Sequence, residues 1–261
     1  MKIQILMSTM KCEHVDDLKL TEKNIYRDIV IVNQTNYESV YYDSENNIKM
    51  IYTNTLGTSI SRNMAIDNSS EEICLIADDD IKYVDNYQKI ILDAFNRHPD
   101  ADIITFQIQT PDGTLFKQNY MTEERKHSMR TALKGASIEI AFKRSSLLKN
   151  NLKVDLEFGL GSRYRIHDDV IFLTDAIKKG MNVYYVPQPI VIHPKESSGT
   201  IYNDFLITSK GAAFYRIFGC KCFAIDFVYS LKKYHEYKDK YSFFKFMKLI
   251  YQGSLEFKST H

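Results

Sequence analysis

The chain has 261 residues, of which 44% are hydrophobic and 26% are charged. This composition is typical of an ordered globular protein and excludes a disordered or fibrous chain. The formal net charge is only +1, so the chain as a whole has no attraction to nucleic acid and we predict no nucleic-acid partner. No hydrophobic run is long enough to span a bilayer.

The beginning of the sequence indicates a strand rather than a secretory leader. Residues 1–7 form a short hydrophobic run that contains Gln4 and is not followed by a cleavage site. We therefore expect the four cysteines to be reduced thiols. The sequence predicts a cytoplasmic protein that is soluble or lies peripherally at the inner face of the cell membrane.

Short β-branched segments in the first part of the chain predict a parallel sheet. Residues 3–7, 28–32 and 48–52 have the composition of strands, and the polar residues 16–24 could form a connecting helix. A strand, a helix-length connection and a second strand are typical of a parallel α/β sheet. Most of residues 36–50 are polar, and we predict an irregular segment there.

Residues 57–66 are interpreted as a glycine- and serine-containing loop that opens a helix, with Ser59 or Ser61 as its N-cap. The free amides at a helix N-terminus and the nearby Arg62 suit a phosphate group. A capped helix with an arginine on its surface explains the same residues, so this segment alone does not decide between the two.

Residues 73–83 carry the most informative pattern in the chain. A hydrophobic run too short for a helix stops at Asp78, Asp79 and Asp80, which predicts a buried strand with three carboxylates at its C-terminal end. Like charges repel there unless a cation or hydrogen-bond donors stabilise them, and the hard cations Mg²⁺ and Mn²⁺ suit carboxylate oxygens. In an extended segment Asp78 and Asp80 point to the same side while Asp79 faces away. An acidic turn after an ordinary strand is the alternative.

The middle of the chain predicts further regular elements. We expect helices over residues 86–97 and 145–149 and strands over residues 102–108 and 137–142. Residues 158–162 contain two glycines and are predicted to form a loop in which the backbone can approach a ligand closely.

A second acidic pair precedes another predicted helix. Asp168 and Asp169 suit the first turn of a helix that ends near Gly180, because negative charge is favourable at a helix N-terminus. Capping of the helix N-terminus alone could explain why both aspartates occur at this position. A strand over residues 181–186 follows, and then His193, a kind of histidine that is more often structural than a metal ligand.

The amino-acid composition of the sequence changes at Ile201. Residues 201–261 predict helices rich in phenylalanine, tyrosine and lysine, which divides the chain into a first domain of residues 1–200 and a C-terminal helical segment of residues 201–261. Helices with this composition can lie on anionic lipid headgroups. They can equally pack onto the first domain or build a homodimer.

The order of these motifs resembles the family 2 glycosyltransferases of the GT-A fold, especially bacterial members that build surface polysaccharides such as capsule. The resemblance covers residues 1–200 and rests on four segments taken in order. They are the strand of residues 3–7, residues 57–63 with Ser61, Arg62 and Asn63, the three aspartates at 78–80, and Asp168 and Asp169 before a helix.

The resemblance implies a nucleotide-binding α/β fold with a mainly parallel sheet flanked by helices. It also implies an inverting transfer of a sugar from a nucleotide-sugar donor, expected to be a UDP-sugar, to a glycan or lipid-linked acceptor, with Mn²⁺ or Mg²⁺ as cofactor. The residues that it singles out are Asp169, or else Asp168, as general base; Asp78 and Asp79 for the donor, Asp78 at its ribose; Asp80 and His193 for the metal; Arg62 for the phosphates; and Asn33 and Gln34 for the base.

Two other classes remain compatible with the sequence. A metal-dependent phosphatase or nucleotidyltransferase also needs carboxylates at the end of a strand, but Lys82 stands where the phosphatase pattern requires threonine. A non-catalytic nucleotide-sugar or glycan-binding protein on the same scaffold would keep the fold while losing the metal site or the base. Because both acidic clusters are present, the sequence favours the enzyme.

Overall fold

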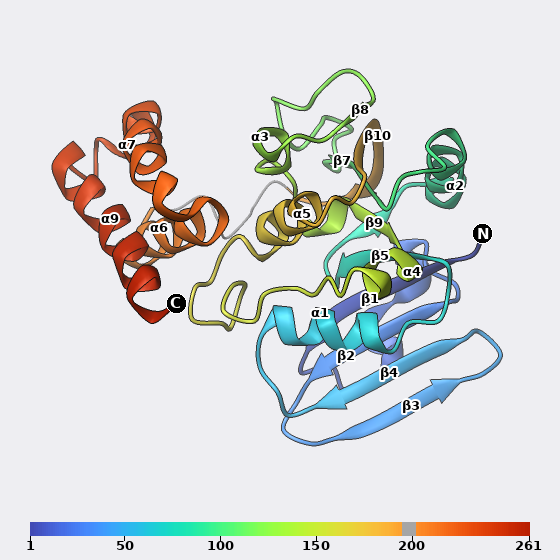
Figure 1. The fold of residues 1–261 in the computed structure, drawn as a ribbon. Coiled ribbons are helices and arrows are strands. Elements are labelled where there is room, and N and C mark those ends of the chain that lie inside the picture. Colours follow the sequence, from blue (N-terminus) through green and yellow to red (C-terminus); the bar gives the residue numbers. More distant parts are fainter. Residues whose placement is uncertain (195–201) are drawn as a thin grey trace.

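A computed structural model describes residues 1–194 and 202–261 of the chain. These residues form one mixed sheet, helices that cover it, and a bundle of C-terminal helices (Figure 1). The strands are β1 (Ile3–Met10), β2 (Ile29–Gln34), β3 (Ser39–Asp43), β4 (Ile48–Thr53), β5 (Ile73–Asp78), β6 (Lys82–Tyr83), β7 (Ile103–Gln109), β8 (Arg125–Lys126), β9 (Ile140–Lys143) and β10 (Val183–Ile192). The α-helices are α1 (Thr58–Asp67), α2 (Tyr87–Arg97), α3 (Met129–Ala132), α4 (Arg144–Lys149), α5 (Asp168–Lys178), α6 (Asp204–Phe218), α7 (Cys222–Lys232), α8 (Tyr234–Tyr237) and α9 (Phe243–Thr260).

The sheet is mainly parallel. Its strand order is β3-β4-β2-β1-β5-β9-β7-β10-β6, and β8 pairs with β10. Six strands run in one direction, namely β4, β2, β1, β5, β7 and β10, whereas β3, β6, β8 and β9 run antiparallel to their neighbours. The predicted fold class is therefore confirmed, and the carboxyl ends of the six parallel strands meet at one edge of the sheet.

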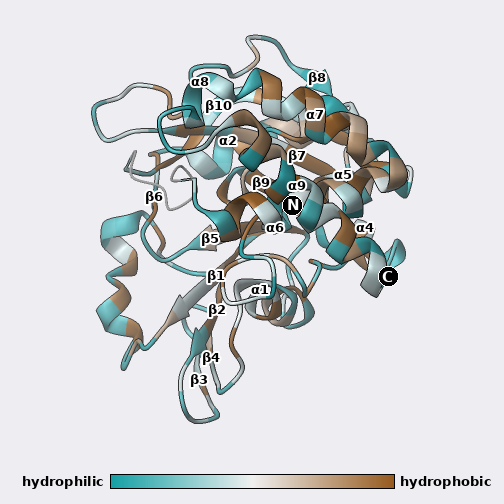
Figure 2. Ribbon diagram, turned by 90° about the vertical axis from the view of Figure 1, so that its left-hand side faces the viewer, coloured by the Kyte–Doolittle hydropathy of each residue, from teal (hydrophilic) through white to brown (hydrophobic). Residues whose placement is uncertain are grey.

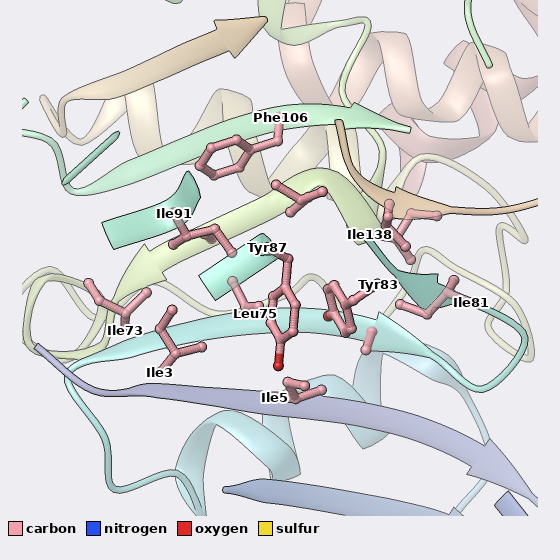
Figure 3. Close-up of a cluster of buried hydrophobic side chains, with 14 of the residues drawn as sticks. Ile3, Ile5, Ile73, Leu75, Ile81, Tyr83, Tyr87, Ile91, Phe106 and Ile138 are labelled. Carbon is pink, nitrogen blue, oxygen red and sulfur yellow. The ribbon is translucent and has the colours of Figure 1, made fainter. Parts of the chain in front are cut away.

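Alternating side chains of the strands build two hydrophobic layers, one on each face of the sheet. In β1, Ile3 and Ile5 belong to the layer that also contains Ile91 of α2 (Figure 3). Leu6 points to the opposite face and belongs to the layer with Phe172 of α5. This period of two is the one that hydrophobic residues follow in strands buried on both faces.

The C-terminal bundle is held together by an unusually close helix contact. A Cβ atom on Gly211 of α6 would lie 1.9 Å from the carbonyl oxygen of Ile250, and one on Gly253 of α9 would lie 1.8 Å from that of Thr208. Only glycine fits at these two positions, so α6 and α9 pack backbone against backbone.

The bundle also shares a core with the rest of the protein beside α5 (Figure 1). Val170 and Ile171 of α5 lie in one hydrophobic cluster with Ala212 of α6 and Phe257 of α9. Packing onto the first domain, one of the predicted alternatives, thus accounts for part of the hydrophobic surface of these helices. The predicted domain boundary between residues 200 and 201 lies outside the described residues, and no helix in the described ranges is long and hydrophobic enough to cross a membrane.

Three local predictions differ from the structure. Residues 36–50 are not irregular, because residues 39–43 form the exposed edge strand β3 and β4 begins at Ile48. Residues 16–24 form two short 3₁₀ turns, Val15–Leu18 and Leu20–Lys23, rather than a helix. The strand predicted over residues 137–142 begins only at Ile140, after a 3₁₀ turn.

Candidate active site

The carboxyl edge of the parallel strands carries a cavity of about 470 Å³. Parallel α/β sheets bind their ligands at this edge. The structure brings eight of the nine residues singled out from the sequence to its wall, which are Gln34, Arg62, Asp78, Asp79, Asp80, Asp168, Asp169 and His193. They come from five separate elements or their ends, so the cavity is assembled only by the folded sheet.

The three consecutive aspartates all line this cavity. The prediction that Asp79 faces away was wrong, because β5 ends at Asp78 and the next two residues lie in a turn where side chains no longer alternate. The Asp79 carboxylate accepts a hydrogen bond from the Thr9 hydroxyl at the end of β1, and its carbonyl oxygen accepts one from Lys23. The two hydrogen bonds hold this turn in place.

Arg62 joins the two acidic clusters. Its guanidinium is buried and donates to a carboxylate oxygen of Asp168, to Asp78 at 3.0 Å and to the hydroxyl of Ser137 at 2.9 Å. A buried arginine with two carboxylate partners is strongly held in place. The geometry therefore shows Arg62 as the bridge between the strand end and α5, whereas the sequence suggested a phosphate contact.

Asp169 has the electrostatic properties of a proton acceptor. Burial, followed by the negative charge of Asp168, raises the pKa of its carboxyl to about 7, although Arg62 acts in the opposite direction. One carboxylate oxygen accepts a hydrogen bond from the amide of Val170 at 2.7 Å, which fixes the side chain at the start of α5. A carboxyl whose pKa lies near neutral pH is suited to general-base chemistry.

Asp80 and His193 lie together at the mouth of the cavity. The antiparallel pairing of β6 with the end of β10 brings them close, and Nε2 of His193 lies 3.2 Å from Oδ2 of Asp80. In the described residues no three His, Cys, Asp or Glu side chains are grouped so that they alone could hold a metal ion. The Asp80 carboxylate nonetheless fits Mg²⁺ or Mn²⁺, because such ions in phosphate sites take most of their ligands from phosphate and water, and a nitrogen ligand from His193 suits Mn²⁺ better than Mg²⁺.

Of the last two residues of β2, one lines the cavity and the other does not. Gln34 lines the cavity, and its side-chain oxygen accepts a hydrogen bond from the amide of Gly57 at 2.8 Å. Asn33 is fully buried outside the cavity wall, where its side-chain amide bonds to both the backbone nitrogen and the backbone oxygen of Cys12. Asn33 thus fixes the loop after β1, and the structure shows it in this position rather than facing a ligand.

The N-terminus of α1 is occupied by the protein itself. Its N-cap is Gly57 rather than Ser59 or Ser61, and the Ser59 hydroxyl donates to the carbonyl oxygen of Phe158. Gly159 has φ +100°, and a Cβ atom there would lie 2.8 Å from Oγ of Ser59 and 3.0 Å from Cγ of Asp168. Gly159 therefore brings the loop of residues 158–162 close to α1 and the acidic pair, while Leu160 of the same loop lines the cavity.

Sequence reasoning missed several residues that line the cavity, namely Ser8, Thr9, Met10, Thr58, Ser137, Leu160 and Arg165. Arg165 is the notable one, because it is exposed at the wall and is the cavity's second arginine. Its place three residues before Asp168 was the only available signal. Ser137 could not be recognised, since its partner Arg62 lies 75 residues away in the chain.

The mainly parallel sheet flanked by helices matches the fold of known structures. Solved structures of TarS from S. aureus, a glycosyltransferase, share it. Residues 1–349 of TarS in complex with UDP-GlcNAc match with a TM-score of 0.62 and 14% identity, over 91% of this chain and 73% of that chain. The same segment in complex with UDP matches with a TM-score of 0.58 and 13% identity, over 93% of this chain and 76% of that chain.

A longer TarS structure matches with a TM-score of 0.58 and 14% identity, over 91% of this chain but only 44% of that chain. This protein thus spans less than half of the longer TarS chain. No protein-family profile and no curated protein matches the sequence. At such low identity the likeness establishes the fold, and the activity must be argued from the residues of the site.

Proposed function

We propose that this protein is an inverting, metal-dependent glycosyltransferase of the family 2 type. It would move a sugar from a nucleotide donor, a UDP-sugar, to a glycan or lipid-linked glycan acceptor in bacterial surface-polysaccharide synthesis. The observation that carries the proposal is the carboxyl of Asp169, whose pKa of about 7 suits a general base, in the same cavity as the aspartate turn after β5. The complexes of TarS with UDP-GlcNAc and UDP support a nucleotide-sugar donor on this fold.

In this proposal the donor lies across the carboxyl ends of β1, β2 and β5. Gln34 stands beside the nucleoside, and Asp78, which Arg62 holds in place, accepts a hydrogen bond from a ribose hydroxyl. Arg165 lines the same cavity and is placed to contact the diphosphate, the role first assigned to Arg62. The donor is thereby fixed by groups that are in place before it binds, which lowers the entropic cost of the reaction.

Asp80 and His193 would hold Mn²⁺ or Mg²⁺, which neutralises the charge that develops on the leaving diphosphate. The acceptor hydroxyl attacks the anomeric carbon as the bond from that carbon to the diphosphate breaks, which inverts the configuration. Asp169 takes the proton of the attacking hydroxyl on one carboxylate oxygen. General-base catalysis of this kind contributes about 10²–10⁴ in rate.

Metal-dependent donor hydrolysis tests this function. The purified protein is incubated with a panel of nucleotide sugars with and without Mn²⁺, beside Asp169→Asn, Asp80→Ala and the control Asp67→Asn. Asp67 is an exposed acid on α1 that pairs with Lys153 and lies outside the cavity wall.

The proposal predicts release of one nucleotide that requires metal, is lost in Asp80→Ala and falls by about 10²–10⁴ in Asp169→Asn, with Asp67→Asn unaffected. If no nucleotide is released and calorimetry detects no nucleotide binding, the transferase proposal is wrong and a glycan-binding protein is the better interpretation.

We further propose a peripheral contact of the C-terminal helices with anionic lipid. Residues 202–261 carry ten Lys or Arg against five Asp or Glu, so they are basic in a nearly neutral chain. Phe227, Leu231 and Phe244 of α7 and α9 are at least 43% exposed, and Figure 2 shows hydrophobic and hydrophilic residues side by side on α7. Exposed aromatic side chains among lysines suit the headgroup region of a bilayer.

Substitution tests this contact better than truncation, because removing the bundle would open the core that it shares with α5. Phe244→Glu with Leu231→Glu should abolish cosedimentation with vesicles that contain anionic lipid, while wild-type protein sediments. Light scattering on the same samples tests the alternative. If the wild type is a homodimer that these changes convert to a monomer, and vesicles bind neither form, the surface is a dimer interface.

A further inference from the structure

A second cavity, of about 190 Å³, adjoins the cavity of about 470 Å³ at the carboxyl edge of the sheet, which we call the donor cavity. Asp168 and Asp169 belong to the walls of both cavities, so the two cavities meet at the acidic pair. The other wall residues come from two segments. His167 lies just before α5, and the C-terminal segment contributes Tyr202, which precedes α6, and Lys210 of α6. We call this the α5–α6 cavity. Residues of the C-terminal segment thus share a cavity wall with the proposed catalytic base.

Lys210 is the cation of the α5–α6 cavity and has no carboxylate within ion-pair distance among the described residues. Its ammonium donates to the hydroxyl of Tyr229 at 3.0 Å. The nearest acid that influences it, Glu236, is already paired with Lys233 and bonded to Tyr202. Burial, and then the charge of Lys233, lower the pKa of Lys210 to about 8. Lys210 is partly buried, and an ammonium removed from water without a counter-charge is costly unless a ligand supplies one.

His167 lines this cavity and carries a second polar group without a partner in the described part of the chain. It adopts φ 67° at the N-cap of α5, and its Nε2 atom is buried without a hydrogen-bond partner in the described residues. Burial, and then the charge of Lys210, lower the pKa of His167 to about 3, so the ring is neutral at physiological pH. A neutral ring nitrogen can donate or accept one hydrogen bond, and buried polar groups normally make one.

The two ends of the cavity therefore carry different polar groups. At one end Asp169 can accept a proton from a hydroxyl, and Asp168 is neutralised by Arg62. At the other end Lys210 offers a positive charge and His167 an unpaired nitrogen. A ligand that carries a hydroxyl and an anionic group on one small framework would match both ends.

We propose that the α5–α6 cavity is the acceptor subsite and that Lys210 and His167 bind an anionic group, a phosphate or a carboxylate, attached to the acceptor sugar. This inference rests on the proposed transferase function, because it takes Asp169 as the base that the acceptor hydroxyl approaches. Lys210 and His167 position the acceptor and take no part in proton transfer.

Nuclear magnetic resonance titrations with three simple probes test the assignment. Glucose 1-phosphate represents a phosphate-linked sugar, glucuronate a carboxylate-bearing sugar, and methyl glucoside a neutral one. All are added to ¹⁵N-labelled protein saturated with UDP and Mg²⁺, so that phosphate cannot enter the donor cavity. Backbone amides of residues 167–169 and 210 report on the α5–α6 cavity.

At least one anionic probe should shift these amides with saturation, and methyl glucoside should bind about tenfold more weakly or worse. Lys210→Met should weaken the anionic probe about 10- to 100-fold, the loss expected for a charge-assisted hydrogen bond. Lys210→Arg should retain most of the affinity. Lys232→Met, which removes an exposed lysine of α7, is the matched control and should bind as the wild type does.

Equal binding of methyl glucoside and the anionic probes, or equal binding by Lys210→Met and wild type, would overturn the assignment. If Lys210→Met does not fold, the comparison of the three probes on the wild-type protein decides the question alone. An absence of shifts with both anionic probes then refutes the assignment of the acceptor subsite. Failure of UDP to bind is a separate outcome that contradicts the proposed function, whatever the probes show.

Discussion

Replacing Asp168 with asparagine should lower the pKa of Asp169. The neighbouring Asp168 carboxylate raises that pKa, and Arg62 lowers it. The exchange Asp168→Asn removes the negative charge and at the same time leaves the Arg62 guanidinium with one carboxylate partner, Asp78, instead of two. Both changes favour the ionised form of Asp169.

The size of the shift follows from Coulomb's law. Two unit charges about 6 Å apart in an effective dielectric of about 20 interact with roughly 3 kcal/mol, or about two pH units. Asp169 is only half-buried, and solvent screening reduces this to about one unit. We therefore expect its pKa to fall from about 7 to about 6.

The pH dependence of kcat/KM measures this shift, because a general base is active only when deprotonated. Activity should decline below about pH 7 in the wild type and below about pH 6 in Asp168→Asn. The ¹³C shift of the Asp169 carboxyl, titrated without substrate, gives the same pKa independently of activity. Asp67→Asn is the control for a surface charge. If the acidic limb of the kcat/KM profile stays in place in Asp168→Asn, or moves to higher pH, Asp168 does not raise the pKa of the catalytic base.

Three further changes probe the stability of the fold. Arg62→Met should lower the free energy of unfolding by about 3–5 kcal/mol in urea titrations, since it leaves the Asp168 carboxylate buried without its partner, and a loss below about 1 kcal/mol would contradict the bridge. Gly211→Ala should cost about 1–3 kcal/mol or more, because its Cβ would lie 1.9 Å from the Ile250 carbonyl oxygen, and an unchanged melting temperature would speak against the close helix contact. Burial raises the pKa of Asp226 to about 7, above its unfolded value, so the stability that it contributes is complete at low pH and is lost as pH rises through 7. Asp226→Asn should therefore stabilise the protein more at pH 8 than at pH 5, and the opposite order in thermal melts would be inconsistent with the raised pKa.

The central strands could be predicted because they are buried on both faces. A short, continuous hydrophobic run that ends at carboxylates, as in residues 73–80, is typical of a buried strand in a parallel sheet. The edge strand β3 was missed because its residues are mostly exposed and it is short and flanked by polar residues, which resembles a loop. Tyr41 and Tyr42 were its main strand signal.

The residues of the candidate site could be predicted, but not the contacts between them. Arg62 was selected as a cation near a helix N-terminus, whereas its bridging position depends on Asp168, which lies 106 residues further along the chain. Lys210 could not be distinguished from other lysines of its segment, because only its burial behind α5 separates it from them. Contacts between distant segments are set by packing, which the order of residue types does not encode locally.

The reversed direction of β9 places a long connection of the chain beside the candidate site. β7 ends at the edge of the sheet that carries the donor cavity, and β9, antiparallel to both β5 and β7, begins at that same edge. The chain between them, residues 110–139, thus leaves and re-enters the sheet beside the site and is tied back by the ion pair between Lys117 and Glu139 at 2.7 Å. The same segment carries β8, which pairs with β10, and Ser137, which accepts a hydrogen bond from Arg62, so one connection supplies both part of the sheet and part of the cavity wall.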